Sequence, residues 1–327
     1  MTYRGNGRVI KGVGGLFTVR VFCTSNEPMP LDSHTVCARG RGSLHRKGAL
    51  LVGDLVEISY DDTSFKRSEG GEVIPSEEGT AISIDRIQTR SCALIRPPMA
   101  NLDVLFVTLA AAAPEPVLET VDKLISIAEY NRIEPIVVVT KSELAPKVAA
   151  GLCEIYRRAG FLTYSVGEGM EGDLPALKRY IDTELDGKIA AFSGASGIGK
   201  STLLNRLFPN LMLQTGEISR RIERGKNTTR HVELYPLSER EGSGYLADTP
   251  GFTMLDFERF DFFDKESLPT TFREFVPLIG ECRYTKCSHT VEQGCAICEA
   301  VKRGEIAKSL HKSFCDLYEV LKKKTKW

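Results

Sequence analysis

The first 92 residues show short runs in which apolar and polar side chains nearly alternate. These runs cover residues 8–10, 16–21, 35–39, 54–58 and 80–84, with Gly, Asp and Ser between them. Alternation with a period of two puts the apolar side chains on one face of a strand. About five short strands predict a small all-β, OB-like barrel, a fold that often binds single-stranded nucleic acid but also serves as a plain structural unit. The acidic, polar residues 61–79 are predicted to form a mobile loop.

From about residue 97 the apolar runs become continuous and alternate with stretches of helical period. Strands are predicted at 102–109, 136–139, 161–165 and 188–193, and helices at 117–128, 146–159 and 174–181. Strands that alternate with helices predict a parallel, doubly wound α/β sheet. After residue 268 the chain is rich in cysteine and ends in a helix, on which Phe314, Leu317, Tyr318 and Leu321 share one face that we expect to pack in a core. We therefore expect three domains, at residues 1–92, 93–268 and 269–327.

The composition supports a folded protein of several domains. The chain has 327 residues, of which 42% are hydrophobic and 26% charged, and 43 basic residues balance 43 acidic ones. These values exclude a disordered or collagen-like chain, and the length exceeds what one hydrophobic core usually serves. The longest apolar run, residues 104–113, is too short to cross a bilayer, which takes about 20 residues. The first residues carry no apolar signal segment, so we expect no membrane association and a cytoplasmic location.

The neutral net charge hides two basic ends. Residues 1–50 carry eight Lys or Arg against two acids, and the segment from Glu299 onward carries eight against four. Basic segments at both ends of a neutral chain indicate contact with a polyanion, although each is also compatible with an ordinary solvated face.

A phosphate-binding motif follows the strand predicted at 188–193. Its residues match G-x-x-x-x-G-K-[ST] and lead into a predicted helix; they are Gly194, Ala195, Ser196, Gly197, Ile198, Gly199, Lys200 and Ser201, followed by Thr202. The glycines let backbone N–H groups surround a phosphate, Lys200 offsets the charge of the β- and γ-phosphates, and Ser201 offers a hydroxyl ligand for Mg²⁺. The motif predicts a site for a nucleoside triphosphate.

Two further elements would complete the phosphate side of this site. Asp248 to Gly251 follow an apolar strand and resemble the D-x-x-G motif of GTPases, in which the Asp acts on Mg²⁺ through water and the Gly N–H senses the γ-phosphate. Between the two motifs lies the polar loop 224–230. Its Asn227, Thr228 and Thr229 are placed as a first switch region, with Thr228 or Thr229 as the Mg²⁺-sensing hydroxyl. An ordinary basic loop is the alternative for this segment.

The base-reading motif of GTPases, N-K-x-D, has its nearest match before the phosphate loop instead of after it. Thr140, Lys141, Ser142 and Glu143 follow the strand at 136–139, and Ser165 opens a second loop after the next strand. The order of the motifs is thus circularly permuted. Because all of them still follow strands of one parallel sheet, we expect them to meet at the carboxyl edge of that sheet.

Four of the nine cysteines lie close together in the sequence. Cys282, Cys287, Cys295 and Cys298 flank His289, and three thiolates with one imidazole suit a closed, tetrahedral, structural Zn²⁺ site. Cys298 could replace His289 as the fourth ligand. Since no export signal is visible, we expect the remaining cysteines to be buried thiols and not disulfides.

Taken together, these motifs resemble one family along nearly the whole chain: the circularly permuted GTPases that depend on the small ribosomal subunit and act in its maturation. The permuted order and the C-x4-C-x-H-x5-C pattern carry the resemblance. It implies an N-terminal OB-like barrel, a central P-loop GTPase and a zinc domain with Cys282, Cys287, His289 and Cys295 as the Zn²⁺ ligands. It further implies a monomeric enzyme that binds the 30S subunit with its 16S rRNA and hydrolyses GTP faster when bound.

The chain departs from this family at several positions. Glu143 stands where the family usually has Asp, and its extra methylene puts the preference for guanine in doubt. Asn227 stands where many relatives have a His, and Phe252 where Ras-like enzymes have a water-orienting glutamine. Asparagine does not shuttle a proton at neutral pH, so we expect slow unaided hydrolysis, with the missing group supplied by the partner or by His231. Two other functions stay open: another P-loop NTPase, and a non-hydrolysing RNA-binding scaffold with a decayed core.

Overall fold

The structure is a computed structural model that describes residues 2–22, 35–42, 44, 49–61, 65–67, 73–75, 82–169, 172–209, 232–238, 242–248 and 262–324. The chain forms two compact units. The first contains residues 1–102, 186–190 and 225–250, and the second contains 103–185, 191–224 and 251–327. The division into three domains expected from the sequence stays a prediction.

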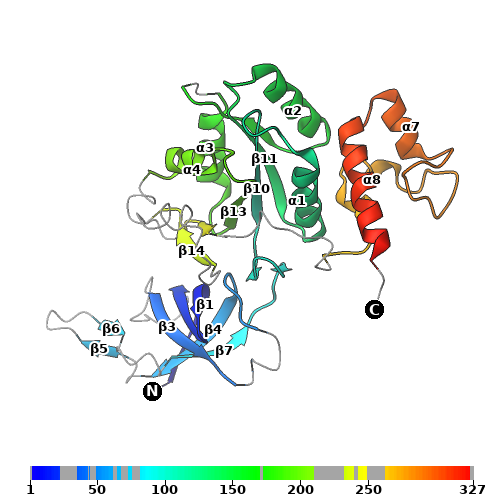
Figure 1. Ribbon diagram of the computed structural model, residues 1–327. Coiled ribbons are helices and arrows are strands. Elements are labelled where there is room, and N and C mark those ends of the chain that lie inside the picture. Colours follow the sequence, from blue (N-terminus) through cyan, green and yellow to red (C-terminus); the bar gives the residue numbers. More distant parts are fainter. Residues whose placement is uncertain are drawn as a thin grey trace. The chain divides into compact units, whose positions relative to one another are not determined.

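The first unit contains a closed five-stranded barrel. Its strands are β1 (Thr2–Val13), β2 (Leu16–Phe22), β3 (Thr35–Gly40), β4 (Leu55–Asp61) and β7 (Ser83–Ile87). They pair in the order β1-β2-β3-β7-β4, and β4 pairs again with β1, which closes the barrel (Figure 1). Only the β3–β7 pair of this barrel is parallel. The expected OB-like barrel is confirmed.

Alternating side chains fill this barrel. Every second residue of β2 and β3 points inward, and the enclosed core includes Val9, Val19, Val36, Ile58 and Ile84. β1 pairs with both β2 and β4, and a bulge between Val9 and Lys11 interrupts its pairing with β2. Asp54, fully buried, accepts from Arg90 Nε at 2.6 Å and from Leu51 N at 2.8 Å. Because both carboxylate oxygens have donors, this charge is tolerated in the interior.

The structure corrects the boundaries of several predicted strands. Residues 61–79 were expected to form a loop, yet β5 (Phe65–Arg67) and β6 (Val73–Pro75) pair as an antiparallel hairpin. The last barrel strand begins at Ser83 instead of residue 80, and β1 begins at Thr2 instead of residue 8. Three-residue strands are too short to show a period, and cross-strand pairing makes up for the low strand propensity of Gly5, Asn6 and Gly7. A further short hairpin joins β8 (Ala93–Leu94) to β9 (Met99–Ala100).

The second unit contains a parallel sheet with connecting helices. β10 (Val104–Ala110), β11 (Glu134–Thr140) and β12 (Thr163–Ser165) pair in parallel, and β13 (Ile189–Ser193) follows on the other side of β10. α1 (Leu118–Tyr130), α2 (Pro146–Arg158) and α3 (Leu174–Glu184) form the crossovers (Figure 1). β10 is buried along its whole length, as its continuous apolar sequence predicts. The expected α/β architecture is confirmed.

One strand pair differs from the expected parallel arrangement. β14 (Glu233–Pro236) and β15 (Tyr245–Asp248), both in the first unit, pair antiparallel. A parallel pair needs a crossover connection of about a dozen residues or more, usually helical, and the segment 237–244 is too short for one.

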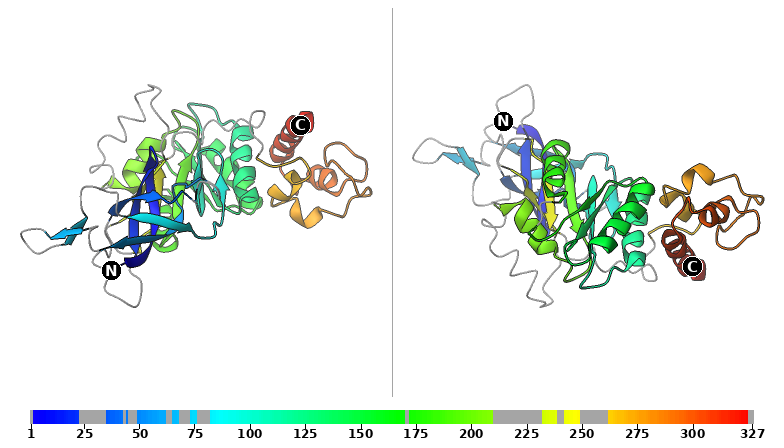
Figure 2. Two further views of the ribbon diagram at one scale, coloured as in Figure 1. Left: turned by 90° about the horizontal axis from the view of Figure 1, so that it is seen from below. Right: turned by 90° about the horizontal axis from the view of Figure 1, so that it is seen from above.

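The C-terminal part of the second unit has little regular structure apart from two helices. η3 (Leu268–Thr271) and η4 (Val276–Leu278) precede α7 (Ala296–Arg303) and α8 (Lys308–Lys323). In both views of Figure 2 this segment lies beside the core helices of the same unit, and α8 packs on α1. The rings of Phe275 and Phe314 lie 4.9 Å apart, and Phe272 meets Phe314 edge-on at 5.4 Å. Phe314, Leu317 and Leu321 are buried, as the helical stripe predicts.

Among the described residues, the structure contains no helix that is both long enough and apolar enough to cross a membrane.

Candidate nucleotide site and metal centre

The phosphate-loop motif lies between a buried strand and a short helix. β13 is buried throughout and ends at Ser193, and α4 (Lys200–Leu207) begins at the motif lysine. Gly194 has φ +153°, and a Cβ there would overlap Thr108 and Ile198. Gly199, the residue before α4, has φ +87°. These positions admit glycine far better than other residues, so the local backbone explains the motif. Ala195 to Gly197 are exposed and Ser201 is half-buried, so the loop presents its backbone outward.

The predicted base-reading loop contacts this phosphate loop directly. The buried hydroxyl of Thr140 lies 2.5 Å from Ile198 O and 3.1 Å from Leu109 O. Lys141 Nζ donates to Gly197 O at 2.7 Å and also to Ala113 O. The strand order explains the contact, because β11 carries the first loop, β13 carries the second, and only β10 separates them. The expectation that the permuted motifs meet at one sheet edge is confirmed for these two loops.

The loop after β12 closes the same site from the other side. Glu168 N donates to Glu143 Oε2 at 2.9 Å, and Arg206 donates to Gly167 O at 2.7 Å. Ser165 N donates to Asp173 Oδ2 at 2.8 Å, which fixes the start of the loop. Main-chain and side-chain bonds thus join all three loops. Gly167 belongs to the loop 165–167 that the sequence indicated as the companion of the base-reading motif, although its contact with Glu143 was not predicted. Thr108 and Arg206 carry no motif that would have identified them.

Some of the remaining predicted site residues lie within the described part of the chain and others lie outside it. Asp248 lies at the end of β15 in the first unit. Asn227, Thr228, Thr229 and Gly251 lie outside the described residues, as do His231 and Phe252. Their roles in Mg²⁺ binding and hydrolysis stay predictions.

The predicted zinc ligands converge on one point. The ligand atoms of Cys282, Cys287, His289 and Cys295 all lie within 4.8 Å of one another. Cys282 Sγ lies 3.8 Å from Cys295 Sγ, and the two sulfurs lie 3.4 and 3.6 Å from His289 Nδ1. A tetrahedral Zn²⁺, with Zn–S bonds of about 2.3 Å and Zn–N bonds of about 2.0 Å, requires S···S edges of about 3.8 Å and S···N edges of about 3.5 Å. The donor set and its spacing fit zinc.

Burial disfavours the charged forms of three groups in this cluster. Desolvation raises the pKa of Cys287 to about 12 and that of Cys295 to about 11, and it lowers the pKa of His289. The thiols of Cys287 and Cys295 are therefore protonated and the imidazole of His289 is neutral at pH 7 in the absence of metal. A bound divalent cation would take the thiolates and the neutral imidazole as ligands and release the thiol protons.

Residues around the cluster fix its ligands. Burial raises the pKa of Glu292, but hydrogen bonds from the Ser288 hydroxyl, from Ser288 N at 2.8 Å and from Val291 N at 3.2 Å outweigh burial and lower this pKa to about 2. His311 Nε2 lies 2.8 Å from His289 O. Cys298 lies beside the four ligands, with Sγ 3.6 Å from His289 O. The geometry thus favours the set with His289 over the alternative with Cys298. No sequence motif identified Glu292 or His311.

A group of buried acids lies where α8 packs on α1. Tyr156 donates to Asp122 Oδ1 at 2.9 Å, and burial raises the pKa of Asp122 to about 7. Ser313 of α8 also hydrogen-bonds Asp122, which opposes this shift. Glu274, again because of burial, has its pKa raised to about 7, with Asp122 contributing. These groups tie α1, α2 and α8 together.

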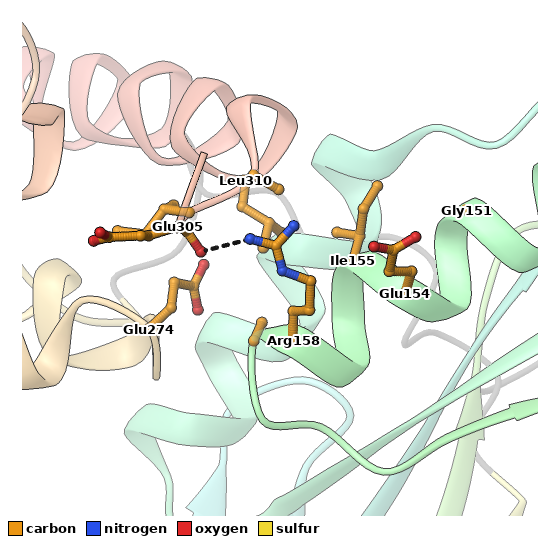
Figure 3. A pocket seen from close by; sticks show the side chains of 10 residues that line it. Gly151, Glu154, Ile155, Arg158, Glu274, Glu305 and Leu310 are labelled. Atoms are coloured by element: carbon orange, nitrogen blue, oxygen red, sulfur yellow. Dashed lines mark hydrogen bonds between the residues drawn. The ribbon is translucent and has the colours of Figure 1, made fainter. Parts of the chain in front are cut away.

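Two arginines extend this contact. Arg273 binds Glu129 at 2.7 Å and Glu134 at 2.9 Å. Arg158 donates to Gly304 O and, at 3.2 Å, to Glu305 O at the end of α7. Figure 3 shows Arg158 reaching across a cavity of about 320 Å³ toward Glu305. The lining contains no residue of the nucleotide motifs, and we assign this cavity a structural role only.

The comparisons with known proteins indicate the same family over nearly the whole chain. The model of the RsgA GTPase family matches residues 87–258. The "Small ribosomal subunit biogenesis GTPase RsgA" of Alkaliphilus metalliredigens is 34% identical over 98% of this chain and 99% of its own length. The protein of the same name from Caldanaerobacter subterraneus subsp. tengcongensis is 34% identical over 99% and 98%.

Solved structures support the same relationship. The crystal structure of YjeQ from Thermotoga maritima aligns with a TM-score of 0.74, 26% identity, and coverage of 99% of this chain and 100% of that one. YloQ, described as a circularly permuted GTPase, aligns with a TM-score of 0.70, 26% identity, and coverage of 99% and 98%. The chain has the permuted GTPase core that its motif order predicts. By sequence and by fold, it belongs to the RsgA GTPase family.

Proposed function

We propose that this GTPase acts in the biogenesis of the small ribosomal subunit, and that it binds the 30S subunit and its 16S rRNA as a cytoplasmic monomer. The relatives that match nearly the whole chain are named for that process. The observation that best supports the proposal is that Thr140 and Lys141 donate to the carbonyls of Ile198 and Gly197, because the proposed base-reading loop then contacts the loop with the phosphate-binding motif.

In this proposal the three loops bind GTP or GDP. The phosphate loop, residues 194–202, surrounds the phosphates, with Lys200 offsetting their charge. Ser201, with Thr228 or Thr229, binds the Mg²⁺, which neutralises charge on the phosphates when bound. Lys141 lies along the base, and the carboxylate of Glu143 accepts from the guanine ring N–H and amino group. Asp248 and Gly251 respond to the γ-phosphate.

Hydrolysis is proposed to be slow unless the partner assists. Asn227 can orient a water molecule but does not accept its proton at neutral pH, and Phe252 cannot orient one. A group from the ribosomal subunit would supply the missing assistance.

We further propose that the nucleotide state is coupled to subunit release. Residues 252–263 connect Gly251 to the zinc-binding segment, and Phe263, at the end of that connection, packs on Tyr130 of α1 at 5.1 Å. Loss of the γ-phosphate would relax this connection. A rigid linker grafted between residues 256 and 268 should leave hydrolysis intact and abolish nucleotide-dependent release; release at the normal rate would refute the coupling.

Basic side chains would supply the salt-sensitive contacts with rRNA phosphates. The structure removes one of them, since Arg8 is 8% exposed, donates to Gly187 O at 3.1 Å and stacks on Tyr245. Arg4, Arg39 and Arg41 are exposed and remain suitable, as do Lys322 and Lys323 in the tail. Binding that barely changes between low and high salt would contradict this part.

The first experiment is nucleotide hydrolysis, with GTP beside ATP, in the presence and absence of purified small subunits. Slow GTP turnover that the subunits strongly accelerate is the expected result. A rate of GTP turnover that the subunits do not change would indicate that the partner is a different one. No turnover under either condition would favour a non-hydrolysing scaffold.

A further inference from the structure

Glu143 lies in a space that one glycine leaves open. Gly167 is buried in the loop after β12, and a Cβ built on it would lie 2.8 Å from Glu143 Oε2 and 2.8 Å from Ser142 Oγ. Both distances are below the closest approach of real Cβ atoms. The carboxylate that ends the base-reading motif therefore occupies its present position only because residue 167 has no side chain.

The carboxylate is also held in that position. Glu168 N donates to Glu143 Oε2 at 2.9 Å, so the backbone next to Gly167 anchors the end of a flexible side chain. An ionised carboxylate has about four lone-pair sites and this bond uses one, which leaves both oxygens able to accept from a base. Fixing one oxygen lowers the entropy that Glu143 would lose when it binds guanine.

The length of the Glu143 side chain and the absence of a side chain at Gly167 are complementary. Glutamate is one methylene longer than aspartate, and the extra length has to be accommodated somewhere. Gly167 supplies the room, and Glu168 N–H supplies the anchor. We propose that Gly167 is a specificity-determining residue for the nucleotide: it positions Glu143 so that the longer carboxylate reads guanine. This inference rests on the proposed binding of GTP by the three loops.

The backbone permits a clean test at this position. Gly167 does not have a left-handed φ, so alanine suits its conformation. The atoms that alanine would meet most closely are the ends of two side chains, so the expected response is displacement of Glu143 and not unfolding. Gly151 of α2 offers the matched control, because a Cβ there meets nothing within 4 Å.

The experiment measures the affinities of the full-length protein for GTP and ITP by displacement of a fluorescent GDP. ITP lacks the 2-amino group, and the ITP-to-GTP ratio of Kd values is independent of the fraction of folded protein. Hydrogen bonds to a charged group are worth about 1.5–3 kcal/mol, so Gly167→Ala should weaken GTP binding about tenfold or more and bring the ratio close to one. Gly151→Ala should keep both values.

A double-mutant cycle with Glu143→Asp separates the pair from a general effect of Gly167→Ala. The shorter carboxylate does not reach the space beside residue 167, so in that background the new Cβ meets only Ser142 Oγ and the backbone N of residue 143. Gly167→Ala should therefore cost severalfold less there than in the unmodified protein. Equal cost in both backgrounds, or an unchanged ratio in Gly167→Ala alone, would overturn the proposed pair while leaving GTP binding in place. Failure of the unmodified protein to bind GTP would instead refute the proposed function, and this inference with it.

Discussion

Two sets of loops in the second unit reach a fixed geometry by different means. The nucleotide loops are joined by hydrogen bonds between side chains and backbone carbonyls, such as Thr140 to Ile198 and Lys141 to Gly197. The cysteine-rich loop has four candidate ligand side chains around one point, and burial raises the pKa of two of its thiols, Cys287 and Cys295. The first set is preorganised by its sheet, whereas the second is proposed to depend on a bound ion. We therefore expect that removal of the ion disrupts the cysteine-rich loop and leaves the geometry of the nucleotide loops unchanged.

The largest effect expected is that of zinc loss. Cys282→Ser combined with Cys295→Ser should abolish metal binding and unfold the segment around residues 282–298, because a structural Zn²⁺ site supplies on the order of 10 kcal/mol to its fold. Metal content and near-ultraviolet circular dichroism measure the change, and affinity for GDP should fall less than about threefold. The exposed Cys37, changed to Ser, is the control. Complete loss of GDP binding in the double variant would mean that the two loop sets depend on each other.

The second effect concerns the hydrogen bonds between the nucleotide loops. Thr140→Val keeps the shape of a side chain that is 4% exposed but removes the donor to Ile198 O. A buried carbonyl without its donor costs about 1–3 kcal/mol, so affinity for GDP should fall about tenfold. Zinc content should stay the same. Thr183→Val on the exposed face of α3 is the control; an equal loss of affinity there would point to a nonspecific effect of the substitution.

The third prediction concerns pH and the contact between α8 and the GTPase core. Burial raises the pKa of Asp122 from 3.8 to about 7. The folded state therefore binds more protons than the unfolded state between those values, and the free energy of unfolding falls as pH rises from about 4 to about 7 and then levels off. Asp122→Asn removes the charge and keeps the acceptor for Tyr156. It should raise the melting temperature at pH 8 by several degrees, with a smaller gain at pH 5.

Asp182→Asn, on the exposed face of α3, is the control for this change. A gain for Asp122→Asn of the same size at pH 5 and pH 8 would exclude the raised pKa as its cause. Glu274, whose pKa is also raised to about 7 by burial, should leave part of the slope in place.

The smallest effect expected is that of Arg158→Ala. This side chain is exposed, and its bonds go to the carbonyls at the C-terminal end of α7. Loss of such a cap costs about 0.5–1 kcal/mol. Hydrogen exchange in α7 should rise severalfold while exchange in β10 stays constant. The exposed Arg179, changed to Ala, should alter neither.

The sequence predicted the parts of the fold that have long periods or strict motifs. Local sequence patterns predicted strand β10, the crossover helices and the phosphate loop. In these elements, whether each residue is buried or exposed follows from its position within the element itself. The chemistry and spacing of the cysteines indicated a metal cluster, and the family resemblance implied which four residues are its ligands. The β5–β6 hairpin was missed because three-residue strands show no period, and the antiparallel β14–β15 pair depends on the length of its connection.

The parts of the candidate site that could not be predicted depend on contacts between distant segments. Nothing near Gly167 in the sequence indicates that it faces a residue 24 positions earlier, because only the fold brings β11 and β12 together. The same holds for Asp122, whose raised pKa depends on Tyr156 and on the burial that α8 provides. Spacing identifies motifs, whereas the residues that position them are known only from the folded chain.

The permuted order of the strands also fixes a sequence of events during translation. β10, β11 and β12, with the proposed base-reading loops, are synthesised before β13 and α4. Domains fold as the chain is synthesised from the N-terminus. A nascent chain that ends before residue 194 therefore has the base-reading loops without the phosphate loop. In the proposed site, capture of a nucleotide would become possible only when synthesis has passed α4, so a bound guanine nucleotide would mark a chain that extends beyond residue 207.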